Sequence, residues 1–133
     1  MRLLPLLLLL TACTAQMEHL PAKGALGPYS SGVASGGEVW LSGKIGAAET
    51  RSGPFAAEVS SALDAVEADL QRELLGWDDV LSVTIHLTDM NLYGTLNDIY
   101  SARIKAPYPA RTCVGVTALP GGARVEITVV ARR

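Results

Sequence analysis

Two charged residues of this 133-residue chain occur where they could act on a small carboxylic acid. Arg111 follows the segment 108–110 at the start of a predicted strand, where its guanidinium could form a bidentate pair with a carboxylate. The alternative is a surface cation at the end of a strand. Glu126 lies between the apolar residues Val125 and Ile127, where it is either paired with an arginine or placed to orient a water molecule. Their chemistry therefore depends on the elements that position them.

The remaining reactive side chains exclude several mechanisms. His19 and His86 are too few for a histidine-rich metal site, and Cys113 has no cysteine nearby, so we expect no metal. The sequence contains no phosphate-binding glycine motif followed by Lys-Ser/Thr and no Gly-x-Ser-x-Gly elbow. Cys113 is more typical of a small buried hydrophobe than of a nucleophile, and we expect His86 to be structural. Nucleotide chemistry and acyl-serine chemistry therefore lose support.

Hydrophobic periodicity predicts the element order ββαβαββ. Apolar residues recur at spacings of 3 and 4 from Phe55 to about Gly76, and again from about residue 92 until Pro107, which predicts two helices. A loop is expected over residues 44–54. Strands are expected over residues 30–34, 38–42, 80–88, 112–118 and 124–131. The pattern indicates an α+β fold with both helices on one face of a mixed sheet.

The sheet face away from these helices is expected to carry little charge. Its predicted residues are mostly small, neutral or semi-polar: Ser82, Thr84, His86, Cys113, Gly115, Thr117, Glu126 and Thr128. Burial against another subunit explains such a face more easily than exposure to water does. We therefore expect a homo-oligomer with ligand pockets along the contact between subunits.

The first residues form a leader. Arg2 precedes the apolar run 3–10, which is about half of the roughly 20 residues needed to span a bilayer, so residues 1–12 are interpreted as a signal peptide. Residues 10–13 resemble the lipobox of bacterial lipoproteins, in which the cysteine, here Cys13, is lipidated. This predicts a lipid-anchored protein of the cell envelope or periplasm, with residues 13–23 as a flexible tether. A secreted soluble periplasmic protein and a misassigned start codon are the alternatives.

Cysteine usage and charge limit the partners. If Cys13 is acylated, Cys113 is a lone thiol; the alternative is a disulfide between the two. Removal of the leader takes Arg2 and leaves a net charge of about −3. Such a surface offers no electrostatic footprint for nucleic acid.

Seven short segments together resemble a known family. They lie at residues 27–30, 41–43, 88–90, 96–100, 109–113, 119–121 and 125–127. In this order and spacing they are similar to the signatures of the Rid (reactive intermediate deaminase, YjgF-like) family, over about residues 24–133. The resemblance implies a homotrimer of a chorismate-mutase-like α+β fold with pockets between subunits. It also implies cofactor-independent hydrolysis of enamines and imines, such as 2-aminoacrylate and 2-iminopropanoate, to a 2-keto acid and ammonia.

The resemblance also implies roles for individual residues. Arg111 would bind the substrate carboxylate, and Glu126 would orient the attacking water toward the imine carbon. The pocket would be completed by Tyr29, Ser42, Asn97 and Cys113. Each has a structural alternative: Tyr29 as a packing residue between subunits, Ser42 as a strand-end cap, and Asn97 as a locally bonded helix residue.

One segment departs from the family pattern. Where the family commonly reads Ser-Gly-Gln-Ile-Pro, residues 42–46 read Ser-Gly-Lys-Ile-Gly. Lys44 either points to solvent, which we prefer, or selects a more acidic substrate.

Two candidate functions follow from the sequence: an imine deaminase, and a non-catalytic binding module for small carboxylates such as keto acids. A ribonuclease activity has been assigned to some relatives, but this sequence contains no basic stripe with aromatic residues that would support it.

Overall fold

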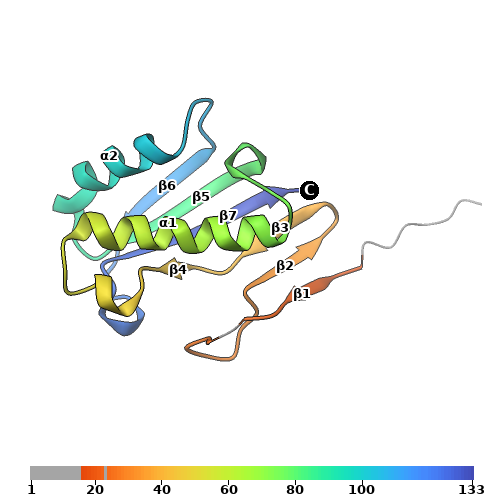
Figure 1. Cartoon of the computed structure of the whole chain (residues 1–133), viewed down its shortest axis with the longest axis horizontal. Helices are drawn as coiled ribbons and strands as arrows, with labels where there is room; N and C mark the ends of the chain where they lie inside the picture. Colours follow the sequence, from red (N-terminus) through yellow and green to blue (C-terminus); the bar gives the residue numbers. More distant parts are fainter. Residues whose placement is uncertain (1–15, 23) are drawn as a thin grey trace, which may run out of the picture.

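The computed structural model describes residues 16–22 and 24–133 as an α+β fold (Figure 1). The predicted signal peptide and Cys13 lie outside the described residues. The strands are β1 (Glu18–Leu20), β2 (Gly32–Ser35), β3 (Glu38–Leu41), β4 (Lys44–Ile45), β5 (Val80–Leu87), β6 (Ala110–Gly115) and β7 (Val125–Arg132). The helices are α1 (Phe55–Arg72) and α2 (Tyr93–Arg103), and short 3-10 turns include η1 (Ala48–Thr50) and η4 (Pro120–Gly122).

All seven strands form one mixed sheet. Its order is β1-β2-β3-β7-β5-β6, and β4 also pairs with β7. Only β5 and β6 run parallel, because α2 crosses over between them, whereas the other pairs are antiparallel. Strands β2 and β3 form a hairpin that closes at Gly36 and Gly37, both of which have a positive φ. The predicted mixed sheet is thus confirmed.

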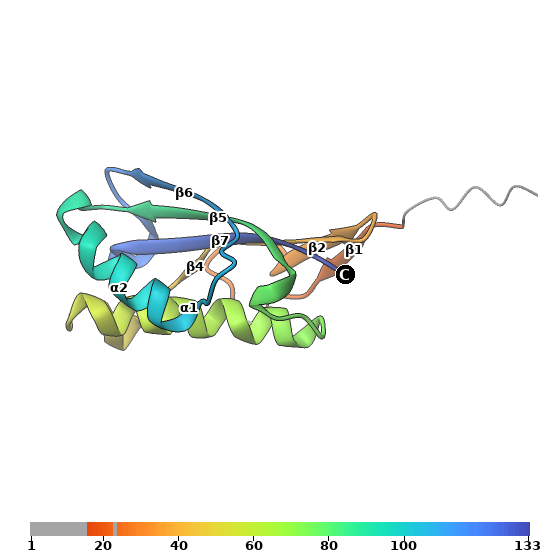
Figure 2. The ribbon, with the colours of Figure 1, turned by 90° about the horizontal axis from the view of Figure 1, so that it is seen from above.

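Both helices cover the same face of the sheet, as predicted (Figure 2). The stripe of α1 is fully buried at Val59, Ala62, Val66 and Leu70, against strand residues that include Ile127. Tyr100 of α2 is buried on the same side. In the described part of the chain, no helix combines the length and the apolar character needed to cross a membrane.

Three local features differ from the sequence expectations. Part of the predicted tether is a strand, because residues 18–20 pair with β2 and cover its free edge. Part of the predicted loop 44–54 is also a strand, because Lys44 and Ile45 pair with β7. Glu58 of α1 carries a charge, which ordinarily places a residue at the surface, yet it is fully buried. It lies three residues after Phe55, on the same helix face, so the spacing itself carried that signal.

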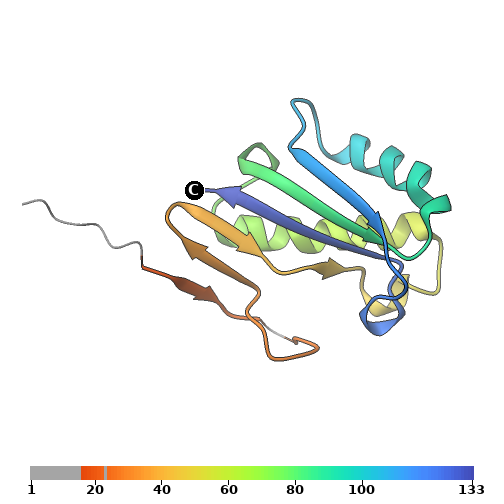
Figure 3. The same ribbon diagram turned by 180° about the vertical axis from the view of Figure 1, so that it is seen from behind.

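The sheet face opposite the helices is uncovered in the chain (Figure 3). Glu126 lies opposite His86, and Thr128 opposite Thr84, as predicted for this face. The assignment of Cys113, Gly115 and Thr117 to it is wrong. Cys113 pairs with Ile85 and Gly115 with Leu87, which are buried under the helices, and Thr117 follows the end of β6. Successive strand residues alternate, so the β6 residues on the uncovered face are Thr112 and Val114.

Candidate active site in two halves

Glu126 lies at a cavity of about 530 Å³, called here the Glu126 pocket. Its wall includes two further residues that the sequence predicted for the site, Tyr29 and Ser42. The other lining residues are Gly24, Leu26, Gly43, Lys44, Ile45, Arg51 and Pro120. The structure thus brings together residues from the segment after β1, the loop after β3, strand β4 and strand β7.

The short strand β4 sets the position of the Glu126 carboxylate. Ile45 pairs with Glu126, which places the preceding loop beside the acid. A Cβ atom built on Gly43 would lie 2.5 Å from Glu126 Oε1, so the carboxylate rests directly against the glycine backbone. Residue 43 is therefore restricted to glycine, and the acid has a fixed floor.

Ser42 and Tyr29 present different groups to this pocket. Ser42 Oγ donates a hydrogen bond of 2.7 Å to the carbonyl oxygen of Ser30, so its proton is engaged and its oxygen is left as an acceptor. That bond also fixes the loop, as the capping alternative anticipated. The Tyr29 side chain is half exposed, and its hydroxyl accepts a 3.4 Å bond from the Leu26 amide.

His86 lies beside Glu126 on the uncovered face. The two residues are direct cross-strand partners, and His86 Nδ1 is 3.7 Å from Glu126 Oε1. Nδ1 is buried and has no hydrogen-bond partner within the part of the chain that the structure describes. The sequence marked His86 as structural and gave no sign of this neighbour, because strand register is not visible in a single sequence.

Lys44 does not point to solvent, which corrects the preferred expectation. It faces the helices and forms an ion pair with the buried Asp69 of α1. Its Nζ also donates a 2.9 Å hydrogen bond to Ser31 Oγ, and Ser31 in turn donates to Asp69. Arg72 bonds the other carboxylate oxygen at 2.6 Å. The Lys44 charge is therefore matched by a carboxylate of the chain itself.

Arg111 occupies a second cavity of about 370 Å³, called here the Arg111 pocket. Its lining residues are Asn97, Asp98, Tyr100, Ser101, Tyr108, Pro109 and Arg111. Arg111 Nη2 donates hydrogen bonds to Asn97 Oδ1 at 2.8 Å and to the Tyr93 hydroxyl at 3.1 Å. The guanidinium carbon also lies 4.8 Å from the centre of the Tyr100 ring. Arg111 is thus a fixed cation rather than a free surface group.

The sequence did not identify the two tyrosines around Arg111, although their spacing carried the signal. Tyr93, Asn97 and Tyr100 are separated by four and three residues, so they share one face of α2. Burial raises the pKa of the Tyr100 hydroxyl, and the nearby Arg111 opposes this shift. A cation held by neutral partners keeps its charge available for an anion.

Cys113 lies on the helix-covered side of β6 and lines neither pocket. It is partly buried and packs against the hydrophobic core. Burial raises the pKa of its thiol, with Arg111 opposing, so the neutral thiol is favoured at neutral pH. This supports the interpretation as a small buried hydrophobe. No group of three or more His, Cys, Asp or Glu side chains in residues 16–22 and 24–133 is arranged to hold a metal ion.

The two pockets lie apart in the chain. Glu126 faces the uncovered side of the sheet, whereas Arg111 pairs with Val83 and shares its helix-covered side. Neither pocket includes a lining residue of the other. Of the predicted site residues, Tyr29, Ser42 and Glu126 therefore lie at one pocket and Asn97 and Arg111 at the other, whereas Cys113 lines neither.

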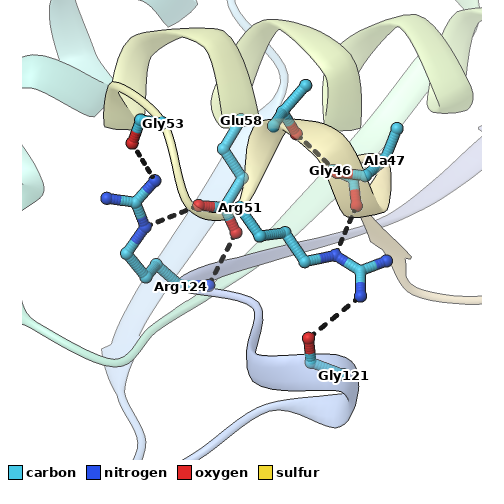
Figure 4. A network of polar contacts seen from close by, with 8 residues as sticks. Gly46, Ala47, Arg51, Gly53, Glu58, Gly121 and Arg124 are labelled. Carbon is cyan, nitrogen blue, oxygen red and sulfur yellow. Dashed lines mark hydrogen bonds and ion pairs between the residues drawn. The ribbon is translucent and has the colours of Figure 1, made fainter.

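A polar network supports the loops at the mouth of the Glu126 pocket (Figure 4). Glu58 accepts a 2.7 Å bond from the Arg124 amide and a 2.6 Å bond from Arg124 Nε. Arg51 donates from Nε to the carbonyl of Gly46 at 2.8 Å and from Nη1 to that of Gly121 at 3.0 Å. These contacts tie the segments after β4 and before β7 to the start of α1. Sequence reasoning missed both arginines, because the contacts of Arg51 with Gly121 and of Arg124 with Glu58 join segments that are distant in the chain.

Comparison with known proteins places this geometry in a family. The family model described as endoribonuclease L-PSP matches residues 19–133. The human 2-iminobutanoate/2-iminopropanoate deaminase is 37% identical over 114 residues, which is 83% of each chain. The protein of the same name from Salmonella typhimurium is 35% identical over 127 residues, which cover 90% of this chain and 97% of the relative.

Solved structures agree with the fold. The crystal structure of RidA from an Antarctic Psychrobacter species superposes with a TM-score of 0.77 and 34% identity, and it covers 90% of this chain and 98% of that chain. The match to the family model begins at residue 19, within β1, whereas the sequence analysis began the domain at residue 24. This chain belongs to the Rid/YjgF family.

Proposed function

We propose that this protein hydrolyses reactive 2-imino acids, and the enamines that tautomerise to them, to 2-keto acids and ammonia without a cofactor. The observation that carries the proposal is the pair of preformed half-sites: a carboxylate at one cavity and an arginine held by neutral partners at another. Relatives named 2-iminobutanoate/2-iminopropanoate deaminase, at 37% identity, support the same chemistry.

The reaction needs positioning more than a strong nucleophile. An imine carbon is already electrophilic, so a water molecule oriented by Glu126 can attack it while Glu126 accepts a water proton. A C–O bond forms, and the proton passes to the nitrogen. The hydroxyl group of the resulting carbinolamine then gives its proton to the nitrogen, the C–N bond breaks as the C=O bond forms, ammonia leaves, and the keto acid remains. Arg111 holds the substrate carboxylate throughout, and its partner Asn97 fixes the guanidinium plane.

The complete site forms between subunits of a homotrimer in this proposal. The uncovered face supports it, because Trp40 and Val114 are 54% and 41% exposed there in the single chain. Contact with a neighbouring subunit would bury these side chains. It would also bring the Arg111 pocket of one chain to the Glu126 pocket of the next. Tyr29 and Ser42 then line one side of the substrate, with Asn97 and Cys113 on the other.

The test is an imine assay on the purified protein. An amino-acid oxidase generates 2-iminopropanoate from alanine, and release of keto acid and ammonia is followed against the rate in buffer. We expect acceleration by the parent, and a loss of at least about 100-fold in kcat/KM for Arg111→Ala and for Glu126→Gln. No acceleration over buffer would refute the proposal. Binding of keto acids in a calorimeter without turnover would select a non-catalytic binding module instead.

We further propose that the protein is anchored in the cell envelope through lipidated Cys13. The support is the sequence of residues 1–13 alone: a basic start, a short apolar run and a lipobox-like segment. Two or more acyl chains anchor a protein stably. Mass spectrometry of the mature N-terminus tests this, because an unmodified Cys13 or an intact residue 1 would contradict it.

The family description also names an endoribonuclease. This chain offers little to an RNA backbone, because it carries 11 basic against 13 acidic residues. The imine assay is therefore the primary test of activity.

A further inference from the structure

Arg51 differs from the other cations around the Glu126 pocket. It follows η1 and contributes to the pocket wall. Its Nε and Nη1 groups donate to the backbone carbonyls of Gly46 and Gly121 (Figure 4). The third group, Nη2, has no hydrogen-bond partner among the residues that the structure describes. The guanidinium is thus fixed in plane while part of its donor fork stays unused.

The neighbouring cations are neutralised by buried carboxylates of α1, and Arg51 is not. Arg124 is paired with the fully buried Glu58 at 2.6 Å, and Lys44 with the buried Asp69. Within the described part of the chain Arg51 forms no ion pair. The cavity wall therefore carries one uncompensated, preorganised positive charge in addition to the Glu126 carboxylate.

An uncompensated arginine in a ligand cavity favours an anionic group on the ligand. In the proposed reaction, on which this inference rests, the carboxylate next to the imine carbon is bound by Arg111. Arg51 is a second cation on the opposite half of the site, so it suits a second carboxylate at the other end of the substrate. A substrate with an apolar side chain would leave this charge unmatched.

We propose that Arg51 is a specificity-determining residue, and that the preferred substrates are 2-imino dicarboxylates, the imines of acidic amino acids. Water adds to the imine carbon and ammonia leaves as before. The side-chain carboxylate is unchanged and serves only for binding. The product is a 2-keto dicarboxylate.

The test compares two imines on the same purified, full-length oligomer. An oxidase generates 2-iminopropanoate from alanine, and another generates the four-carbon 2-imino dicarboxylate from aspartate. The readout is the ratio of the two kcat/KM values, because loss of the carbonyl contacts of Arg51 would lower both rates and cancel. For the parent protein we expect a ratio of at least about tenfold in favour of the dicarboxylate. Arg51→Gln should lower that ratio about tenfold, whereas Arg51→Lys, which keeps the charge, should retain most of it.

A matched control is Arg103→Gln. Arg103 pairs with Asp64 and Glu67 away from either pocket, so its removal should leave the ratio unchanged. If both imines are hydrolysed but the ratio is the same in the parent and in Arg51→Gln, the specificity inference is wrong and the deaminase function stands. If neither imine is hydrolysed faster than in buffer, the proposed function itself fails.

Discussion

The Glu126 pocket and the Arg111 pocket are supported by opposite means. Beneath the Glu126 pocket, buried carboxylates of α1 pair with one cation of strand β4 and with one that directly precedes β7: Asp69 with Lys44, and Glu58 with Arg124. In the second, Arg111 is held at the sheet edge by an amide and two tyrosine rings, and it forms no ion pair with any residue that the structure describes.

Because of this difference, substitutions beneath the Glu126 pocket should mainly affect stability, whereas substitutions in the Arg111 pocket should mainly affect substrate binding. A buried ion pair that loses one partner leaves an uncompensated charge, so changes beneath the Glu126 pocket should destabilise the fold. The contacts of Arg111 are more exposed, so changes there should alter substrate binding and leave the fold nearly intact. The two halves can therefore be perturbed independently, and each prediction below tests one side of this contrast.

The largest effect is expected from mixing two inactive variants. Arg111→Ala and Glu126→Gln each disable one half-site and should each lose at least about 100-fold in kcat/KM. If the halves of one site come from different chains, random mixed oligomers should recover about a quarter of the parent's activity. The measurement is the imine assay after co-expression with different tags.

The control for mixing is the double variant Arg111→Ala/Glu126→Gln, co-expressed with Arg111→Ala. That combination contains no intact Arg111 and should stay inactive. Mixed oligomers of the two single variants, verified by tag, that show no recovery would place both residues of a site on one chain.

The next effect is on stability. Glu58→Gln should lower the free energy of unfolding by about 3–5 kcal/mol, because Arg124 keeps its charge but loses its fully buried partner. The matched control on the same helix is Asp64→Asn, whose side chain is 65% exposed and should cost less than about 1 kcal/mol. Urea unfolding at equal chain concentrations measures both. Equal losses would remove the distinction between the buried and the exposed pair.

A smaller effect is expected in the Arg111 pocket. Asn97→Ala removes the 2.8 Å bond that fixes the guanidinium, so kcat/KM should fall about tenfold while the free energy of unfolding changes by less than about 1 kcal/mol. Asn91→Ala, at an exposed position before α2, serves as the control. A loss of stability as large as that of Glu58→Gln would show that both pockets are supported alike.

The sequence predicted the elements well because they depend on local periodicity. The stripe from Phe55 to Leu70 and the alternation of residues 80–87 correspond to α1 and β5. Register was harder: the assignment of Cys113 to the uncovered face is wrong by one residue, because pairing with Ile85 is a long-range property. The strand β4, of two residues, is too short for any periodicity to reveal.

The sequence named candidate residues, but it did not reveal their surroundings. Arg111, Asn97 and Glu126 follow from residue type and family resemblance, and each lies at a cavity. Lys44 was expected in solvent because Asp69 is 25 positions away, and only the packing of α1 on the sheet joins them. Charge partners across elements are tertiary facts, which a single sequence does not contain.

The smallest effect is expected for Cys113, which lines neither the Glu126 pocket nor the Arg111 pocket. Its thiol is partly buried, its pKa is raised by burial, and the opposing influence of Arg111 is the smaller one. The thiolate is therefore a minor species at pH 7, and Cys113→Ala should change kcat/KM by no more than about threefold. Alkylation of the parent should be slow at pH 7 and should accelerate steadily as the pH rises, because the thiolate fraction grows about tenfold per pH unit below the pKa. A 100-fold loss of activity in Cys113→Ala with unchanged stability would instead make the thiol a participant, and rapid alkylation at pH 7 would show that Arg111 outweighs burial.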